Sequence, residues 1–190
     1  MQQRNPTTYY TLAAESSPAN TPAPASARRG PAIVALGPVQ MPDYLDRPQI
    51  VVRETDYRLH LATTDVWAAP LSDMVPRVLI DDLSRRLPGT RVVGFPQVSG
   101  PNFEYRVSVD ITRFDVDAEG TATLAARWQI YPAASTRAVV VEDSTAERRS
   151  SESGYPAAVA ALSGTLADLS DRIAQTLITL PVSTSPADAR

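Results

Sequence analysis

The stretch from Leu45 to Leu87 places the tightest limits on how this chain can fold. It begins with a polar turn at residues 46–48 and enters an extended run at residues 49–53, which is rich in β-branched side chains. A second extended run at residues 57–61 follows a short polar connection. Two such runs around a tight polar connection are typical of a β-hairpin. The sequence therefore predicts a hairpin here.

The residues after the hairpin carry the pattern of a helix. Apolar side chains recur every three or four positions between Leu71 and Leu87, and the charged side chains fall largely outside that stripe. Pro70 suits the position just before such a helix, and Pro88-Gly89 marks its end. Pro76 predicts either a late start or a kink in the first turns.

A second, longer helix is predicted near the end of the chain. Large apolar residues step by three or four positions from Val159 to Leu180, with alanine and glycine between them that permit close packing. Pro156 and Pro181 bound this helix, because proline is tolerated at a helix start but not in its interior. We expect the apolar stripe to cover a sheet, while the alanine-rich flank is free to face another subunit.

Three further segments have the character of strands. Residues 7–12 and residues 90–95 are short runs of strand-forming side chains. Residues 32–36 form a continuous apolar run that ends at Gly37-Pro38. A continuous run of this kind indicates a strand buried on both faces.

The clearest strand pattern lies in the middle of the chain. Apolar and polar residues alternate over residues 103–111, and the alternation reverses at Arg113-Phe114, which predicts a bulge or the strand end. Residues 122–130 alternate in the same way and are the expected partner strand. A third run begins at residues 139–141 and fades into the polar residues 143–153.

Two segments have compositions unlike the rest. Residues 13–30 contain almost no large apolar side chain, so they cannot offset the entropy of ordering and are predicted to be a flexible linker or loop. Residues 182–190 are predicted to be a disordered tail. We expect residues 1–190 to form a single domain of the α/β class, in which a compact mixed β-sheet is combined with two long helices.

The composition argues against several kinds of function. The net charge of −3 argues against a nucleic-acid-binding protein, which normally presents a basic surface. All 18 basic residues are arginine, so the chain offers no amine for a Schiff base and no lysine for a phosphate-binding loop. It contains no cysteine, which removes thiolate nucleophiles and cysteine metal sites. We therefore expect no enzymatic activity, cofactor or metal.

Individual candidates for chemistry have simpler explanations. His60 is the only histidine, and it lies on the opposite strand face from Leu59 and Leu61, so we interpret it as structural or surface-exposed. Residues 115–120 resemble the first half of a calcium-binding loop, but the position of the twelfth ligand is Ala126. A turn between two strands explains this segment better, with adventitious calcium binding as the weaker alternative.

Two pairs of residues are assigned structural roles for similar reasons. Asp81 and Asp82 are adjacent on the first helix and point about 100° apart, so we expect them on a solvated face rather than converging on one ligand. Trp67 and Trp128 are predicted to be core anchors. Trp67 immediately precedes the helix, so it is also a candidate for an interface.

Four segments in a fixed order resemble a known family. They are Tyr-Tyr-Thr-Leu at residues 9–12, Arg-Pro-Gln-Ile-Val-Val-Arg at residues 47–53, Trp-Ala-Ala-Pro-Leu at residues 67–71, and Val-Leu-Ile-Asp-Asp-Leu-Ser-Arg-Arg-Leu at residues 78–87. Together they resemble the ABC-type transport auxiliary lipoprotein family over about residues 9–180. The combination of Arg-Pro-Gln-Ile-Val with Trp-x-x-Pro-Leu at this distance is the most specific part.

The resemblance implies a lipoprotein of Gram-negative bacteria that is anchored in the outer membrane and faces the periplasm. Members of the family work beside MCE-domain proteins, which carry lipids between the two membranes, and they have no known activity or cofactor. The implied fold is a mixed sheet with two long helices, similar to the N-terminal domain of TolB, and self-association into a ring is expected. Because no cysteine is present to carry the lipid, the resemblance implies a natural chain whose anchor precedes Met1.

A docking protein of this kind would offer its partner exposed side chains rather than catalytic groups. The candidates that we select for contact with the MCE-domain partner come from the turn before the hairpin and from the start of the first helix. They are Arg47, Pro48, Gln49, Trp67, Pro70 and Leu71. The alternative is a periplasmic carrier that holds a lipid itself, which requires an apolar cavity between helix and sheet.

Overall fold

The computed structural model describes residues 6–15, 30–96 and 103–181. Most of the predicted linker and all of the predicted tail lie outside the described residues. The elements in chain order are β1 (Thr8–Tyr10), β2 (Ile33–Gln40), β3 (Gln49–Thr55), β4 (Arg58–Trp67), α1 (Leu71–Arg86), β5 (Arg91–Gly94), β6 (Tyr105–Asp117), β7 (Thr121–Pro132), β8 (Val140–Arg149) and α2 (Tyr155–Thr179).

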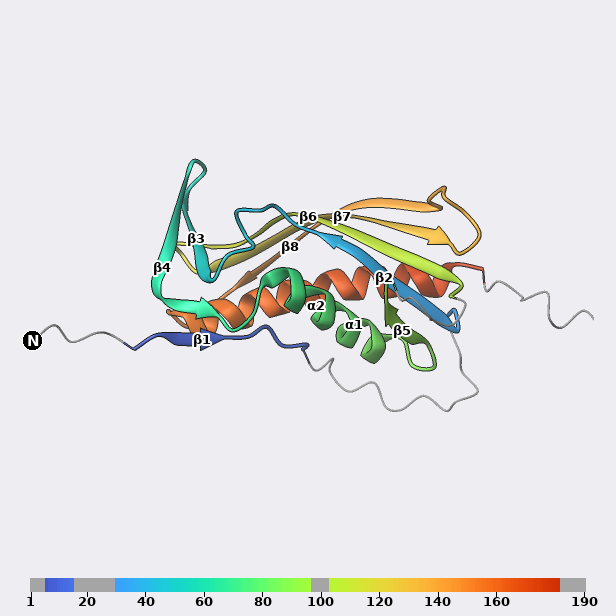
Figure 1. Cartoon of the computed structure of the whole chain (residues 1–190), viewed down its shortest axis with the longest axis horizontal. Coiled ribbons are helices and arrows are strands. Elements are labelled where there is room, and N and C mark those ends of the chain that lie inside the picture. The colour runs from blue at the N-terminus through green and yellow to red at the C-terminus, as the bar shows by residue number, and fades with distance from the viewer. Residues whose placement is uncertain (1–5, 16–29, 97–102, 182–190) are drawn as a thin grey trace, which may run out of the picture.

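Strand β6 is the centre of one eight-stranded mixed sheet (Figure 1). Along one edge it pairs in parallel with β2 through its first half and with β3 near its end. Along its other edge it pairs antiparallel with β7, which pairs in turn with β8. Strands β4 and β1 extend the sheet beyond β3, and β5 extends it beyond β2. The predicted α/β fold with a mixed sheet and two long helices is thus confirmed.

Both helices cover the same face of this sheet, as Figure 1 shows. Helix α2 packs on β6, β7 and β8, while α1 packs on β2 and β5 and against α2. The core between the layers is built from the inward residues of the central strands and the apolar stripes of the helices, among them Leu83, Trp128, Ile130 and Leu166. The opposite face, here called the outer face, carries neither of these helices.

Several local predictions are confirmed. The hairpin is formed by β3 and β4, and the predicted strand at residues 7–12 is β1, which pairs with β4. The reversal of alternation in β6 is a true irregularity, because the register with β7 shifts between Ile111 and Arg113. Trp67 and Trp128 are core anchors, with 5% and 0% of their surfaces exposed.

The structure corrects the predicted end of β2. The strand continues past Gly37-Pro38 to Gln40, with a shift in its register against β6. Gly37 has a φ of +137°, and a Cβ at this position would lie 2.5 Å from the backbone oxygen of Phe95. Glycine therefore allows the strand to continue where another residue would clash with the chain beside it.

Three other boundaries also differ from the prediction. Asp115, expected in a turn, lies fully buried within β6. The polar segment after Val141 remains a strand, because Ser144 and Ala146 of β8 are buried and the strand stays paired with β7 as far as Arg149. Helix α1 begins at Leu71 and contains Pro76, so the predicted late start is wrong.

Candidate docking surfaces

The distal part of the β3–β4 hairpin stands away from the body of the protein (Figure 1). We call residues 54–61 the projecting hairpin. Strand β3 pairs with β6 only at Val52 and Arg53, and β4 pairs with β1 only from Asp65 onward. Among the described residues, the two outer edges of the projecting hairpin therefore pair with no further strand. A two-stranded hairpin without further contacts is marginally stable in water.

The projecting hairpin exposes apolar side chains at its turn and on one of its faces. Tyr57 is 99% exposed at the turn, and Leu59 and Leu61 are 37% and 38% exposed. His60, on the other strand face, is also exposed, which agrees with its interpretation as a surface residue. Exposed aromatic and aliphatic groups on a projecting element are a common feature of contact surfaces.

A buried carboxylate fixes the base of this hairpin to the central strand. Arg53 donates two hydrogen bonds to Oδ2 of Asp115 at 2.9 and 2.6 Å, and Arg113 donates one to Oδ1 at 2.9 Å. The hydrogen bond to Asp115 raises the pKa of Arg53 above its ordinary value. Because Asp115 is fully buried, the pair holds β3 against β6 at the point where the projecting hairpin leaves the sheet.

The outer face of the sheet carries a row of side chains that crosses four strands. Val93, Ala35, Arg106 and Tyr131 are successive cross-strand neighbours on β5, β2, β6 and β7. The guanidinium carbon of Arg106 lies 4.5 Å from the centre of the Tyr131 ring and 5.1 Å from that of Phe95. Arg106 is therefore held between two aromatic rings by cation–π contacts.

Further apolar groups extend this row to the edge of the sheet. Phe103 packs edge-on against Phe95, with 6.0 Å between the ring centres. Val139, just before the edge strand β8, and Val141, near its start, are 55% and 58% exposed. Val141 pairs with Gln129 of β7, which places it on the outer face. We call this set of residues the outer-face patch: Phe95, Phe103, Arg106, Tyr131, Val139 and Val141.

The six residues selected from the sequence lie together where β3 begins and β4 ends, away from the projecting turn. The backbone N–H of Trp67 donates to the carbonyl of Pro48 at 2.7 Å, and Gln49 pairs with Val66. The side chains of Trp67 and Leu71 are buried, whereas Pro48 and Pro70 are exposed. The structure thus brings the two segments into one corner, and contact of this corner with a partner stays a prediction.

Arg47 and its neighbour Asp46 support this corner from within the chain. The Arg47 Nε donates to the carbonyl of Tyr44 at 2.7 Å. The Asp46 carboxylate accepts hydrogen bonds from the backbone N–H and the hydroxyl of Ser72, in the first turn of α1. A carboxylate at this position stabilises a helix start, because the first N–H groups have no partner inside the helix.

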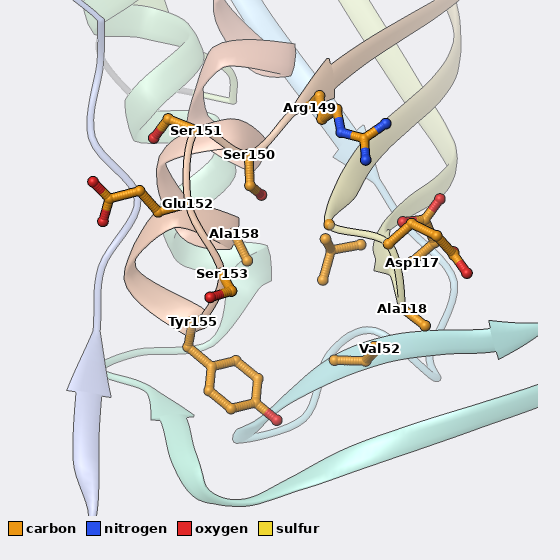
Figure 2. A pocket seen from close by; sticks show the side chains of 14 residues that line it. Val52, Asp117, Ala118, Arg149, Ser150, Ser151, Glu152, Ser153, Tyr155 and Ala158 are labelled. Atoms are coloured by element: carbon orange, nitrogen blue, oxygen red, sulfur yellow. The ribbon is translucent and has the colours of Figure 1, made fainter.

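A cavity of about 410 Å³ lies where α2 begins, beside the β6–β7 turn and the β8–α2 loop (Figure 2). Val52, Ala158 and the ring of Tyr155 form its apolar side, and Asp117 and Arg149 lie on a polar side. Its residues place no histidine or cysteine beside a nucleophile. The arrangement can hold a small amphiphilic group, with its apolar part beside Val52 and Tyr155 and its polar part beside Asp117 and Arg149.

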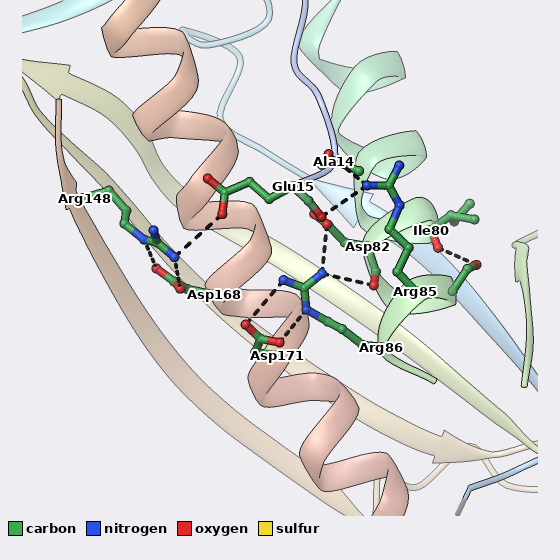
Figure 3. Close-up of polar contacts among 10 residues, drawn as sticks. Ala14, Glu15, Ile80, Asp82, Arg85, Arg86, Arg148, Asp168 and Asp171 are labelled. Atoms are coloured by element: carbon green, nitrogen blue, oxygen red, sulfur yellow. Dashed lines mark hydrogen bonds and ion pairs between the residues drawn. The ribbon is translucent and has the colours of Figure 1, made fainter. Parts of the chain in front are cut away.

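The two helices are joined by ion pairs that the sequence analysis missed (Figure 3). Arg86 of α1 donates to Oδ1 of Asp82 at 2.9 Å and to Oδ1 of Asp171 on α2 at 2.5 Å. Asp82 is fully buried, so its predicted place on a solvated face is wrong. Burial raises the pKa of Asp82 to about 6, although Arg86 acts in the opposite direction.

Within residues 6–15, 30–96 and 103–181, no group of three or more histidine, cysteine, aspartate or glutamate side chains is placed to hold a metal ion. Over the same ranges, neither helix combines the length and the apolar character needed to span a bilayer.

Fold and surfaces together define a small two-layer α/β domain that exposes apolar surface at both ends of its sheet. The chain belongs to the family of ABC-type transport auxiliary lipoprotein components, whose model matches residues 10–174. The family resemblance found in the sequence is thereby confirmed, and membership suggests a non-catalytic role.

Individual relatives agree with this assignment. The chain is 25% identical over 156 residues to the intermembrane transport lipoprotein PqiC of Escherichia coli K12, a match that covers 82% of this chain and 80% of that protein. PqiC of Shigella flexneri matches to the same extent. The crystal structure of a Xanthomonas campestris protein has the same fold, with a TM-score of 0.72 at 22% identity over 90% of this chain and 96% of that one.

Proposed function

We propose that this chain is a non-catalytic periplasmic subunit of an MCE-type intermembrane lipid transport system, held at the outer membrane by a lipid anchor. Copies of the chain assemble into a ring, and the ring docks the MCE-domain protein. The observation that carries this proposal is the pair of exposed apolar surfaces, the projecting hairpin and the outer-face patch. The strand ends that carry them lie at opposite ends of the sheet (Figure 1). Family membership and the likeness to intermembrane transport lipoproteins support the transport role.

In the ring, the projecting hairpin of one copy packs on the outer-face patch of the next. The two surfaces complement each other, because Tyr57 and Leu59 offer apolar groups to Tyr131 and Val141. Among the described residues neither Asp56 at the hairpin turn nor Arg106 in the patch has an ion-pair partner. Contacts between two different surfaces of identical chains close into rings when the rotation between neighbours permits.

Light scattering of the purified protein tests the assembly. We expect one discrete species whose mass is a multiple of the 20.5 kDa chain. A monomer at every concentration up to the millimolar range would reject the ring.

Contact with the MCE-domain protein is assigned to the corner that contains Pro48 and Pro70, since both are exposed there. We expect Pro48→Asp to weaken binding of the purified MCE-domain protein at least tenfold in a surface-immobilisation assay. Pro88→Asp, at an exposed proline beyond the end of α1, is the matched control and should bind normally. Equal affinities for the two variants would exclude this corner as the contact.

The second candidate function is a periplasmic carrier that binds a lipid itself. The cavity beside Tyr155 and Val52 is the observation that favours it, since it joins an apolar side to charged groups. Native mass spectrometry of protein purified from membranes tests this function. A bound lipid that is lost in Ala158→Trp, which fills the cavity, would support the carrier, and protein free of lipid would remove it.

A further inference from the structure

The N-terminal segment is built onto both helices by specific contacts. We call residues 8–15 the N-terminal arm. Its first three residues form β1, which pairs in parallel with β4. Leu12 follows with 5% of its surface exposed, so its side chain belongs to the core. The backbone N–H of Ala13 then donates to the Ser163 hydroxyl of α2 at 3.3 Å.

The end of the arm is held by arginines from two other elements (Figure 3). Arg85 of α1 donates to the carbonyl oxygens of Ala14 and Glu15 at 3.1 and 3.2 Å. The Glu15 carboxylate lies 3.9 Å from Arg148 of β8. Gly164 leaves room for that carboxylate, because a Cβ on this residue would lie 2.9 Å from Glu15 Oε1. The arm therefore occupies a groove whose walls are α1 and α2.

The arm is joined to the rest of the domain by more chain than its position requires. Glu15 lies at Gly164, and Gly30 lies near Ile178, a point 14 residues further along α2. Fourteen residues of helix are about 21 Å long. The connecting residues 16–29 can span at most about 50 Å when extended. The connection thus has more than twice the reach that it needs.

From this geometry we propose that the N-terminal arm is exchanged between copies, so that the arm of one chain occupies the α1–α2 groove of its neighbour. This inference rests on the self-association in the proposed function. The exchanged arm makes the same contacts as the arm in its own groove, so exchange requires no new surface. A tether of this length presents the arm to its own groove at an effective concentration of about a millimolar, so exchange can compete only where copies are held together, as in the proposed ring.

The absence of cysteine from the chain makes a cross-linking test unambiguous. Glu15→Cys and Arg148→Cys replace two side chains that are 41% and 43% exposed and meet across the groove. The two single variants, one of them carrying a mass tag, are unfolded together, refolded and treated with a short bismaleimide. We expect this pair to give at least ten times more tagged–untagged dimer than a control pair of Glu15→Cys with Arg137→Cys. Arg137 is an exposed arginine outside the groove.

The double variant Glu15→Cys/Arg148→Cys separates the possible results. Covalent dimers and larger species on a denaturing gel are the expected outcome of exchange. Monomers with internal cross-links, in a protein whose mass by light scattering is that of an oligomer, would overturn the exchange and leave the ring intact. A monomeric mass in solution would instead overturn the ring, and the exchange with it.

Discussion

Asp82 shows how a single side chain sets the electrostatics of the helix layer. It lies one turn before Arg86, so its carboxylate forms an ion pair with the guanidinium. The same guanidinium also pairs with Asp171 on α2. The second carboxylate oxygen, Oδ2, is buried without a hydrogen-bond partner among the described residues. Burial of the charged form therefore has a free-energy cost that the ion pair with Arg86 offsets only in part.

The raised pKa predicts how stability depends on pH. In the folded protein the pKa of Asp82 is about 6, above its ordinary value of 3.8. The folded state therefore favours the protonated carboxyl, and this contribution is complete below about pH 4 and is lost as the pH rises through about 6. A difference of this size is worth at most about 3 kcal/mol.

We therefore expect Asp82→Asn, which is neutral at every pH, to gain stability relative to the native chain between pH 4.5 and pH 7.5. Urea unfolding at the two pH values measures the difference, and Asp81→Asn on the exposed neighbour is the control. A stability difference between Asp82→Asn and the native chain that stays constant over this range would show that Asp82 does not titrate there.

The failure to predict this buried charge has a simple cause. Two adjacent aspartates resemble a solvated face, but Asp82 lies about 100° around the helix from the exposed Asp81, which places it on the packed side. Asp82 follows Leu79 by three positions and Val75 by seven, so helical spacing already places it on the apolar stripe. The contact between Arg86 and Asp171 could not be predicted, because pairing the two helices requires the tertiary structure.

Among the elements, two strands are longer than the alternation of apolar and polar residues predicted. Strand β8 is polar after Val141, yet it pairs with β7 along its whole length and buries only Ser144 and Ala146 against the layer of helices. Strand β6 continues through Asp115 because Arg53 and Arg113 neutralise the carboxylate. Alternation of apolar and polar residues identifies strands with one apolar face. It does not identify strand residues such as Asp115, whose burial depends on an ion pair.

The role of Arg53 at the base of the hairpin is testable in isolation. We expect Arg53→Met to lower the free energy of unfolding by about 2–4 kcal/mol, because it leaves the fully buried Asp115 with Arg113 alone. Arg58→Met is the matched control, since this arginine pairs with Glu54 at the exposed end of the same hairpin and should cost less than about 1 kcal/mol. Equal losses in denaturant titrations would mean that Asp115 does not anchor the hairpin.

For the molecule as a whole, the decisive feature is the order of the strands rather than their identity. Periodicity predicted the helices and most of the strands, but nothing in it indicates that β2 and β3 share one edge of β6. That arrangement makes the projecting hairpin leave the sheet at one end, while the outer-face patch lies at the other (Figure 1). The surfaces that matter for assembly are therefore products of topology.

Two different surfaces at opposite ends predict a specific behaviour on mixing. Tyr57→Ser/Leu59→Ser alters only the projecting hairpin, and Val139→Asp/Val141→Asp alters only the outer-face patch, so each variant should be monomeric by light scattering. An equimolar mixture retains one intact hairpin and one intact patch per pair. It should therefore form heterodimers and nothing larger. Thr145→Asp, at an exposed position further along β8, should still form the full assembly. If each surface instead contacts its own copy, each variant would self-associate through its remaining surface, which would contradict the head-to-tail arrangement.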